Sequence, residues 1–262
     1  MKNITQQALR KVYNTFFNPT DSNNLNKKWT DLEYILNSKD FTSQYLLENM
    51  CFPEVEHQVG RYLNMQNVVK GLDSPENGEI IKGDIIEFGT WQGLSLVYFA
   101  RLLGANPHNR RLVGIDSFEG LPHDSNIWEK GDFSNTELNF VINILLKNSP
   151  NSFSRNSFSL IQGWFSDEVV RTQLYKQVKN AALIHFDADL YSSTIEALEL
   201  VNLYLKNRVE PIYFLFDDWG CHPDEVPEAF YKWLDEINKT QLVKAEKISS
   251  TRFTRYYKIT FN

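Results

Sequence analysis

The chain has 262 residues, of which 42% are hydrophobic and 14% aromatic, and its formal net charge is −6. This composition excludes disordered and collagen-like chains, and the two cysteines, Cys51 and Cys221, are too few and too far apart for a disulfide framework or a thiolate metal site. The acidic balance, without a block of basic residues, argues against a nucleic-acid partner and favours a neutral or cationic small ligand.

Residues 1–80 are predicted to form a helical N-terminal extension without strands. Apolar residues recur there at a spacing of three to four, for example at Tyr62, Met65 and Val69, which is typical of a helix with one buried face. The first thirty residues lack the apolar stretch of a signal peptide, and no run reaches the ~18–20 apolar residues of a membrane span. We therefore expect a cytoplasmic protein without a membrane partner.

Residues 81–262 are predicted to form an α/β domain, because short apolar runs alternate with helical periodicity. The expected strands are 84–88, 111–116, 157–162, 181–187, 211–217, 242–248 and 254–260. The expected helices include 94–102, 195–205 and 226–237. This order predicts a mostly parallel, seven-stranded sheet with helices on both faces, and an antiparallel C-terminal hairpin because no helix separates the last two strands.

A glycine-containing turn follows the first expected strand, which ends in Glu87 and continues as Gly89-Thr90-Trp91-Gln92-Gly93. Glycines at such a turn let the backbone approach a ligand, and the amides at the start of the next helix are free to bind it. Trp91 stands where a dinucleotide fingerprint has its second glycine, and a carboxylate at Glu87 attracts a sulfonium rather than a phosphate. The turn therefore favours S-adenosylmethionine over NAD, with a plain tight connection as the alternative.

The second expected strand ends in Asp116, 27 residues after Gly89. Ligands of an open α/β sheet bind beyond the carboxyl ends of its strands, where an acidic side chain can accept both hydroxyls of a ribose. Asp116 is therefore a candidate ribose ligand, although it could instead cap the turn that follows.

Acidic pairs follow two further buried strands: Asp187 with Asp189, and Asp217 with Asp218. Four carboxylates at one rim repel one another, so a positive group is expected between them. Oxygen ligands suit Mg²⁺, Ca²⁺ or Mn²⁺ rather than zinc, while simple capping by Asp189 and Asp218 is the alternative. His185, inside the fourth strand, is expected to be a hydrogen-bonded core side chain.

Five segments match a known family in order and spacing: GDIIEFGTWQG (83–93), DSFEGLP (116–122), GWF (163–165), DADLYSST (187–194) and DD (217–218). Together they resemble the macrocin and mycinose O-methyltransferase family of bacterial sugar methyltransferases, over roughly residues 62–233. The resemblance implies a class I methyltransferase fold that is Rossmann-like, S-adenosylmethionine as methyl donor, carboxylate-bound Mg²⁺ and a sugar hydroxyl as acceptor. Residues 81–262 would then be the catalytic domain that binds S-adenosylmethionine.

Site roles follow from the same resemblance. It implies that Asp187, Asp217 and Asp218 bind the metal and that Asp189 is the general base. The cofactor-binding residues that it implies are Glu87, for the methionine amino group, Asp116, for the ribose, and the neighbouring Gly89, Thr90, Gly93 and Ser117. If Asp189 is not the base, His222 is the next candidate.

The predicted reaction is methyl transfer from S-adenosylmethionine to a hydroxyl or vicinal diol of a sugar or glycosylated natural product. A divalent cation makes a nearby hydroxyl more acidic, and an adjacent carboxylate can then take the proton. The alternatives are a catechol or other phenolic acceptor, a NAD-linked oxidoreductase and a non-catalytic binding protein. We also expect a homo-oligomer such as a dimer.

Overall fold

The computed structural model describes residues 54–73, 80–104, 108–125, 128–150, 153–219, 225–250 and 253–261. The chain divides into two compact units, one of residues 1–55 and 119–135 and the other of residues 56–118 and 136–262. In the first unit the Leu121 amide donates to the Asp132 carbonyl, and the Gly131 amide donates to the Leu121 carbonyl, each at 2.9 Å, which closes a loop. The helices expected before residue 54, and His222, lie outside the described residues. The separate N-terminal extension therefore stays a prediction.

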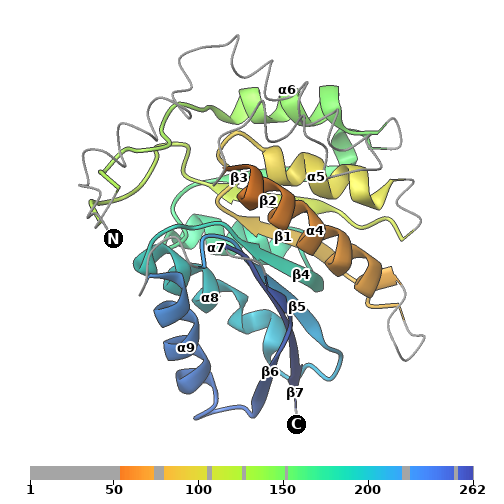
Figure 1. Ribbon diagram of the computed structural model, residues 1–262, viewed down its shortest axis with the longest axis vertical. Coiled ribbons are helices and arrows are strands. Elements are labelled where there is room, and N and C mark those ends of the chain that lie inside the picture. The colour runs from red at the N-terminus through yellow and green to blue at the C-terminus, as the bar shows by residue number, and fades with distance from the viewer. Residues whose placement is uncertain are drawn as a thin grey trace. The chain divides into compact units, whose positions relative to one another are not determined.

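The second unit contains a single sheet of seven strands in the order β3-β2-β1-β4-β5-β7-β6 (Figure 1). The strands are β1 (Asp84–Phe88), β2 (Leu112–Asp116), β3 (Phe158–Gln162), β4 (Ala181–Phe186), β5 (Ile212–Phe216), β6 (Val243–Ser250) and β7 (Arg255–Phe261). The first five run parallel, and β7 runs antiparallel to both β5 and β6. The predicted sheet with its antiparallel C-terminal hairpin is confirmed, and the second strand of the hairpin is the one that pairs with β5.

Helices cover both faces of this sheet. They are α4 (Glu54–Asp73), α5 (Leu94–Leu103), α6 (Leu138–Asn148), α7 (Glu168–Gln177), α8 (Tyr191–Leu205) and α9 (Val226–Ile237), with a short 3-10 helix at Arg155–Ser157. In Figure 1, α4, α5 and α6 lie on one face, and α7, α8 and α9 lie on the other. The helix expected around Tyr62 is confirmed as part of α4. The expected helices did not include α6 and α7, each of which buries a pair of apolar residues four apart: Val141 and Leu145, and Val170 and Leu174.

The arrangement of the strands creates the position for a site. Every residue of β4 and of β5 is buried, which explains why all residues of these two strands except His185 are hydrophobic. In the sheet, β2 and β3 lie on one side of β1, and β4 and β5 lie on its other side. In open α/β sheets, ligands bind beyond the carboxyl ends of the strands at such a switch point, which lies here between β1 and β4.

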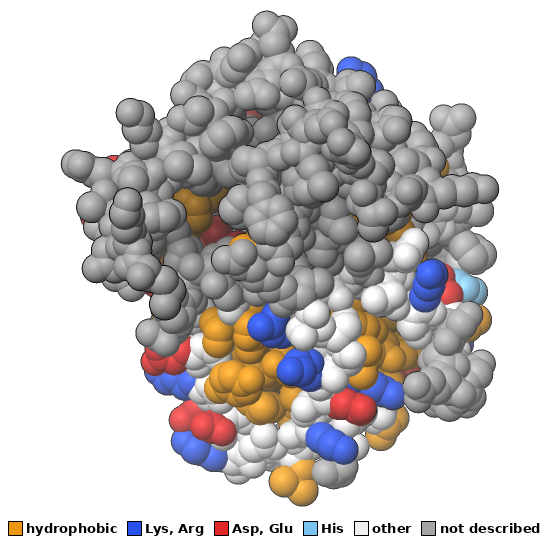
Figure 2. Space-filling view, viewed as in Figure 1, with side chains coloured by type: hydrophobic (Ala, Val, Ile, Leu, Met, Phe, Trp, Pro, Cys, Tyr) orange, Lys and Arg blue, Asp and Glu red, His pale blue; other side chains and the backbone are white. Residues whose placement is uncertain are grey.

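The described surface carries hydrophobic and charged side chains of both signs. Figure 2 shows hydrophobic side chains gathered over the lower part of this face, with Lys, Arg, Asp and Glu side chains interspersed around them. Among the described residues, no helix combines the length and the apolar character that crossing a membrane requires.

Candidate active site

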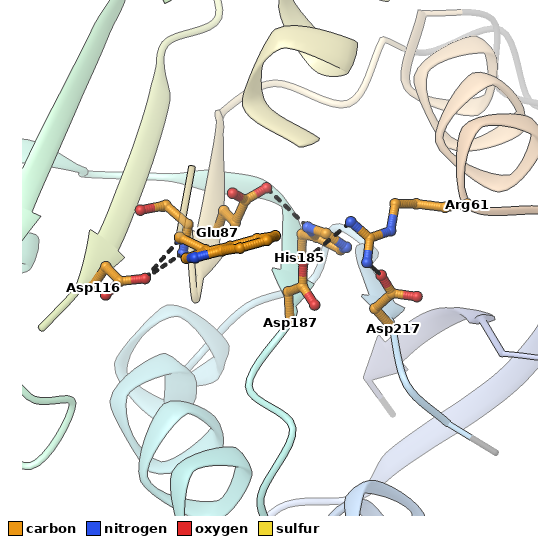
Figure 3. Close-up of polar contacts among 8 residues, drawn as sticks. Arg61, Glu87, Asp116, His185, Asp187 and Asp217 are labelled. Carbon is orange, nitrogen blue, oxygen red and sulfur yellow. Dashed lines mark hydrogen bonds and ion pairs between the residues drawn. The ribbon is translucent and has the colours of Figure 1, made fainter. Parts of the chain in front are cut away.

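The carboxyl ends of β4 and β5 bring two of the predicted acids together (Figure 3). Asp187 directly follows β4 and Asp217 directly follows β5. One carboxylate oxygen of each, together with a ring nitrogen of His185, lies within 4.8 Å of the others. Asp217 is only 1% exposed and Asp187 is half-buried. The structure therefore places three potential metal ligands around one point, and the predicted roles of Asp187 and Asp217 as ligands stay predictions.

The other two acids, Asp189 and Asp218, occupy strained backbone positions. Their φ angles are 53° and 52°, in the left-handed region, which costs a non-glycine residue about 1–2 kcal/mol. Asp189 is the central residue of a tight turn closed by a hydrogen bond from the Leu190 amide to the Ala188 carbonyl, at 2.5 Å. The N-cap position of α8 is Leu190, so Asp189 is not its cap. Such strain is often found at functional sites.

Asp189 also interacts with Asp218 through a side-chain hydrogen bond, which lowers the pKa of Asp189 but does not outweigh the opposing effects. Burial, followed by the negative charges of Asp187 and Asp217, raises the pKa of Asp189 well above its ordinary value. The four acids thus form one electrostatic cluster, as the sequence predicted.

A positive group does lie between these acids, and it is Arg61 of α4 (Figure 3). Its Nη1 is 3.5 Å from Asp187 Oδ2, and its Nη2 forms an ion pair with Asp217 Oδ2. Burial alone would lower the pKa of this guanidinium, but the charges of Asp187 and Asp217 outweigh burial and hold the pKa well above its usual value. The sequence did not indicate this residue, because α4 lies far from the acids along the chain.

A second buried pair joins β1 and β4. Glu87 and His185 are cross-strand neighbours, both side chains are fully buried, and Glu87 Oε2 lies 2.9 Å from His185 Nδ1. Burial would lower the pKa of His185, but the hydrogen bond and the charge of Glu87 raise it above its ordinary value. The prediction that His185 is a hydrogen-bonded core side chain is confirmed. Glu87 has no exposed surface in this structure. Its predicted contact with a methionine amino group stays a prediction.

Asp116 organises the glycine-containing turn. Its Oδ2 accepts hydrogen bonds from the Thr90 and Trp91 amides, both at 2.8 Å, and its Oδ1 accepts one from the Phe118 amide at 2.7 Å. Burial raises the pKa of Asp116 above its ordinary value, although these three donors counteract the effect. A carboxylate has about four acceptor positions, so Asp116 retains capacity for a ligand. Thr90, whose amide is one of these donors, and Ser117, the residue that follows Asp116, are both buried.

Two glycines of this turn are required because a side chain would not fit there and because their backbone has a positive φ. Gly89 has φ +85°, and a Cβ added to it would lie 1.8 Å from the carbonyl oxygen of Asp187. Gly93, at φ +81°, precedes α5, and its added Cβ would lie 2.7 Å from a methyl carbon of Val141. The turn after β1 therefore packs directly against the start of the acidic loop after β4.

Gly89→Ala is expected to destabilise the fold far more than Gly131→Ala. Gly131 has nearly the same φ, +84°, but an added Cβ there meets nothing within 4 Å. The control should therefore lose about 1–2 kcal/mol through backbone strain alone. Gly89→Ala should lose more than about 4 kcal/mol, because the Asp187 carbonyl must also move. Denaturant unfolding measures both values, and equal losses would contradict the close packing described here.

Comparisons with known proteins identify related sequences and folds. The family model for macrocin-O-methyltransferase (TylF) matches residues 6–246. The 8-demethyl-8-(2,3-dimethoxy-alpha-L-rhamnosyl)-tetracenomycin-C 4'-O-methyltransferase of Streptomyces olivaceus is 31% identical over 150 residues, which are 53% of this chain and 54% of the relative. The mycinamicin III 3''-O-methyltransferase of Micromonospora griseorubida is 22% identical over 235 residues, which are 86% of this chain and 89% of the relative. The chain thus spans about half the length of the first of these relatives.

A comparison with solved structures indicates a methyltransferase fold as well. The solved structure of the calicheamicin methyltransferase CalS11 matches with a TM-score of 0.58 at 22% identity, over 90% of this chain and 93% of that one. The predicted class I, Rossmann-like methyltransferase fold is therefore confirmed.

Proposed function

The chain belongs to the macrocin-O-methyltransferase (TylF) family, and from this premise we propose that it transfers a methyl group from S-adenosylmethionine to a hydroxyl of a sugar or glycosylated natural product, with the help of Mg²⁺. The observation that carries the proposal is the acidic cluster after β4 and β5, which meets the glycine-containing turn after β1. The contact of Gly89 with the Asp187 carbonyl brings the two together.

The relatives support the choice of acceptor. One is named for methyl transfer to the 4'-oxygen of a rhamnosyl tetracenomycin, and another for transfer to the 3''-oxygen of mycinamicin III. A sugar hydroxyl is therefore the acceptor that we propose for this chain as well.

The donor set fits a hard divalent cation. Asp187, Asp217 and Asp218 supply carboxylate oxygens, which Mg²⁺ prefers, and the two aspartates of the β4 and β5 ends already hold one cationic group, Arg61. When bound, Mg²⁺ would make a nearby alcohol more acidic.

The chain's own residues then have separate tasks. Asp116 and the glycine-containing turn after β1 hold the donor, so that its methyl carbon lies in line with the acceptor oxygen. The oxygen–carbon bond forms as the sulfur–carbon bond breaks, and S-adenosylhomocysteine leaves. Asp189, at the tip of its strained turn, takes the hydroxyl proton onto its carboxylate. Exclusion of water by the buried surroundings strengthens these electrostatic interactions.

Asp116→Ala is expected to weaken S-adenosylhomocysteine binding by about 1.5–3 kcal/mol, the scale of hydrogen bonds to a charged group. Asp84→Ala is the matched control, because Asp84 also accepts a backbone hydrogen bond, from the Arg111 amide at 3.0 Å, but at the opposite ends of the strands. Titration calorimetry measures both affinities.

The same experiment with the 2′-deoxy analogue separates a direct ribose contact from an effect on the turn. Wild type should bind the analogue more weakly than S-adenosylhomocysteine, and Asp116→Ala should bind the two alike. If the variant still discriminates between them, Asp116 holds only the backbone of Thr90 and Trp91.

A panel of acceptors tests the proposed function. Glycosylated natural products and nucleotide sugars are compared with catechols, with S-adenosylmethionine and Mg²⁺ present, and methylated products are identified by mass spectrometry. We expect methylation of a sugar hydroxyl. Methylation of the catechols alone would replace the sugar by a phenolic acceptor.

A further inference from the structure

Arg61 occupies the position between the two acids that a metal would need. Its Nη1 and Nη2 face Asp187 Oδ2 and Asp217 Oδ2, so one planar guanidinium bridges the ends of β4 and β5 (Figure 3). The side chain of Arg61 is 11% exposed and that of Asp217 has no exposed surface, so solvent screens this contact weakly.

Without a cation the cluster would be unstable. Buried carboxylates that lose their partner keep the full penalty of leaving water. Asp217 is buried beside Asp187, and the negative charge of Asp218 also acts on Arg61. Arg61 supplies the compensating charge from α4, a helix outside the acidic loops.

The same geometry leaves no room for two cations at those oxygens. Mg²⁺ binds carboxylate oxygens at about 2.0–2.1 Å and demands near-octahedral geometry. A guanidinium that occupies the facing oxygens of Asp187 and Asp217 blocks that position and repels the ion. Arginine has several rotatable side-chain bonds, so its head can withdraw while the backbone of α4 stays in place.

We propose that Arg61 is an exchangeable internal cation: it holds Asp187 and Asp217 together in the metal-free protein and leaves that position when a divalent ion binds. The inference rests on the metal site of the proposed function. Under this exchange, Arg61 lowers the affinity for the metal and stabilises the chain until the metal arrives.

Mn²⁺ titration of the full chain tests the exchange. Arg61→Ala should bind Mn²⁺ roughly 10- to 100-fold more tightly than wild type, within the usual range of coupling between two ligands. Arg110→Ala is the control: Arg110 is also buried and ion-paired, with Asp73 at 2.9 Å, but it lies at the opposite ends of the strands and should leave Mn²⁺ affinity unchanged.

Free guanidinium provides a second readout. At low, non-denaturing concentration it should compete with Mn²⁺ in Arg61→Ala but not in wild type, with sodium chloride at equal concentration as the ionic-strength control. Metal-free Arg61→Ala should melt several degrees below wild type, and either guanidinium or saturating Mn²⁺ should restore much of the loss. If this variant does not fold without a cation, Arg61→Lys is used, and its Mn²⁺ affinity should stay near that of wild type.

The outcomes separate the exchange from the metal site itself. Equal Mn²⁺ affinity in wild type and Arg61→Ala, or weaker affinity in the variant, overturns the exchange and leaves the metal site standing. Absence of Mn²⁺ binding in both proteins overturns the metal part of the proposed function, and the exchange with it.

Discussion

Asp189→Asn is expected to lower kcat by about 10²- to 10⁴-fold, the usual range for removing a positioned proton acceptor, while Mg²⁺ and S-adenosylmethionine binding stay nearly intact. The structure makes asparagine a suitable replacement. Asp189 has φ 53°, and asparagine tolerates this left-handed conformation better than most residues. The turn after β4 should therefore keep its shape while the proton acceptor is lost.

Asp187→Asn is the matched comparison, two residues earlier in the same segment. It should raise the Mg²⁺ concentration needed for half-maximal rate, because Asp187 lies at the rigid end of β4 and faces Asp217. Steady-state kinetics over a range of Mg²⁺ concentrations distinguishes the two variants. If both lose Mg²⁺ affinity equally, with no separate effect on kcat, both carboxylates are ligands and His222 becomes the next candidate for the base.

Removing the metal should abolish methyl transfer without unfolding the protein. An alcohol is a weak acid, and without a divalent cation nearby Asp189 alone cannot make it an effective nucleophile. Exhaustive chelation should reduce the rate to background, added Mg²⁺ should restore it, and the affinity for S-adenosylhomocysteine should stay unchanged.

The pairing of Arg61 with Asp187 and Asp217 predicts that the chelated protein stays folded. Because Arg61 already neutralises Asp187 and Asp217, the chelated protein should keep its circular dichroism spectrum and a cooperative melting transition. Full activity after chelation would show that the acidic cluster works without a metal. Unfolding on chelation would show that Arg61 does not stabilise the cluster.

The sequence predicted the parts of the site that depend on local order along the chain. Strands buried on both faces leave largely apolar runs, so the ends of β4 and β5, and hence Asp187 and Asp217, could be predicted without a structure. The turn after β1 was visible because its glycines interrupt the pattern between a strand and a helix. The sequence also indicated that the clustered acids need a positive group.

The identity of that group could not be predicted. Arg61 lies in a helix whose apolar spacing describes its buried face, and nothing in this spacing says that an arginine there reaches Asp217. The pairing of Glu87 with His185 depends on the register of β1 against β4, which the sequence alone does not specify. The same limit applies to Asp116, whose three backbone donors come from turns that fold around it.

A crystal structure of the chain with S-adenosylhomocysteine and Mn²⁺ would test the central claim most directly, because Mn²⁺ is located by its anomalous scattering. We predict one strong peak bound by Asp187, Asp217 and Asp218, with Arg61 withdrawn, the ribose on Asp116 and the cofactor sulfur facing Asp189. An anomalous peak elsewhere, or Arg61 still between the two aspartates with Mn²⁺ bound, would contradict this prediction.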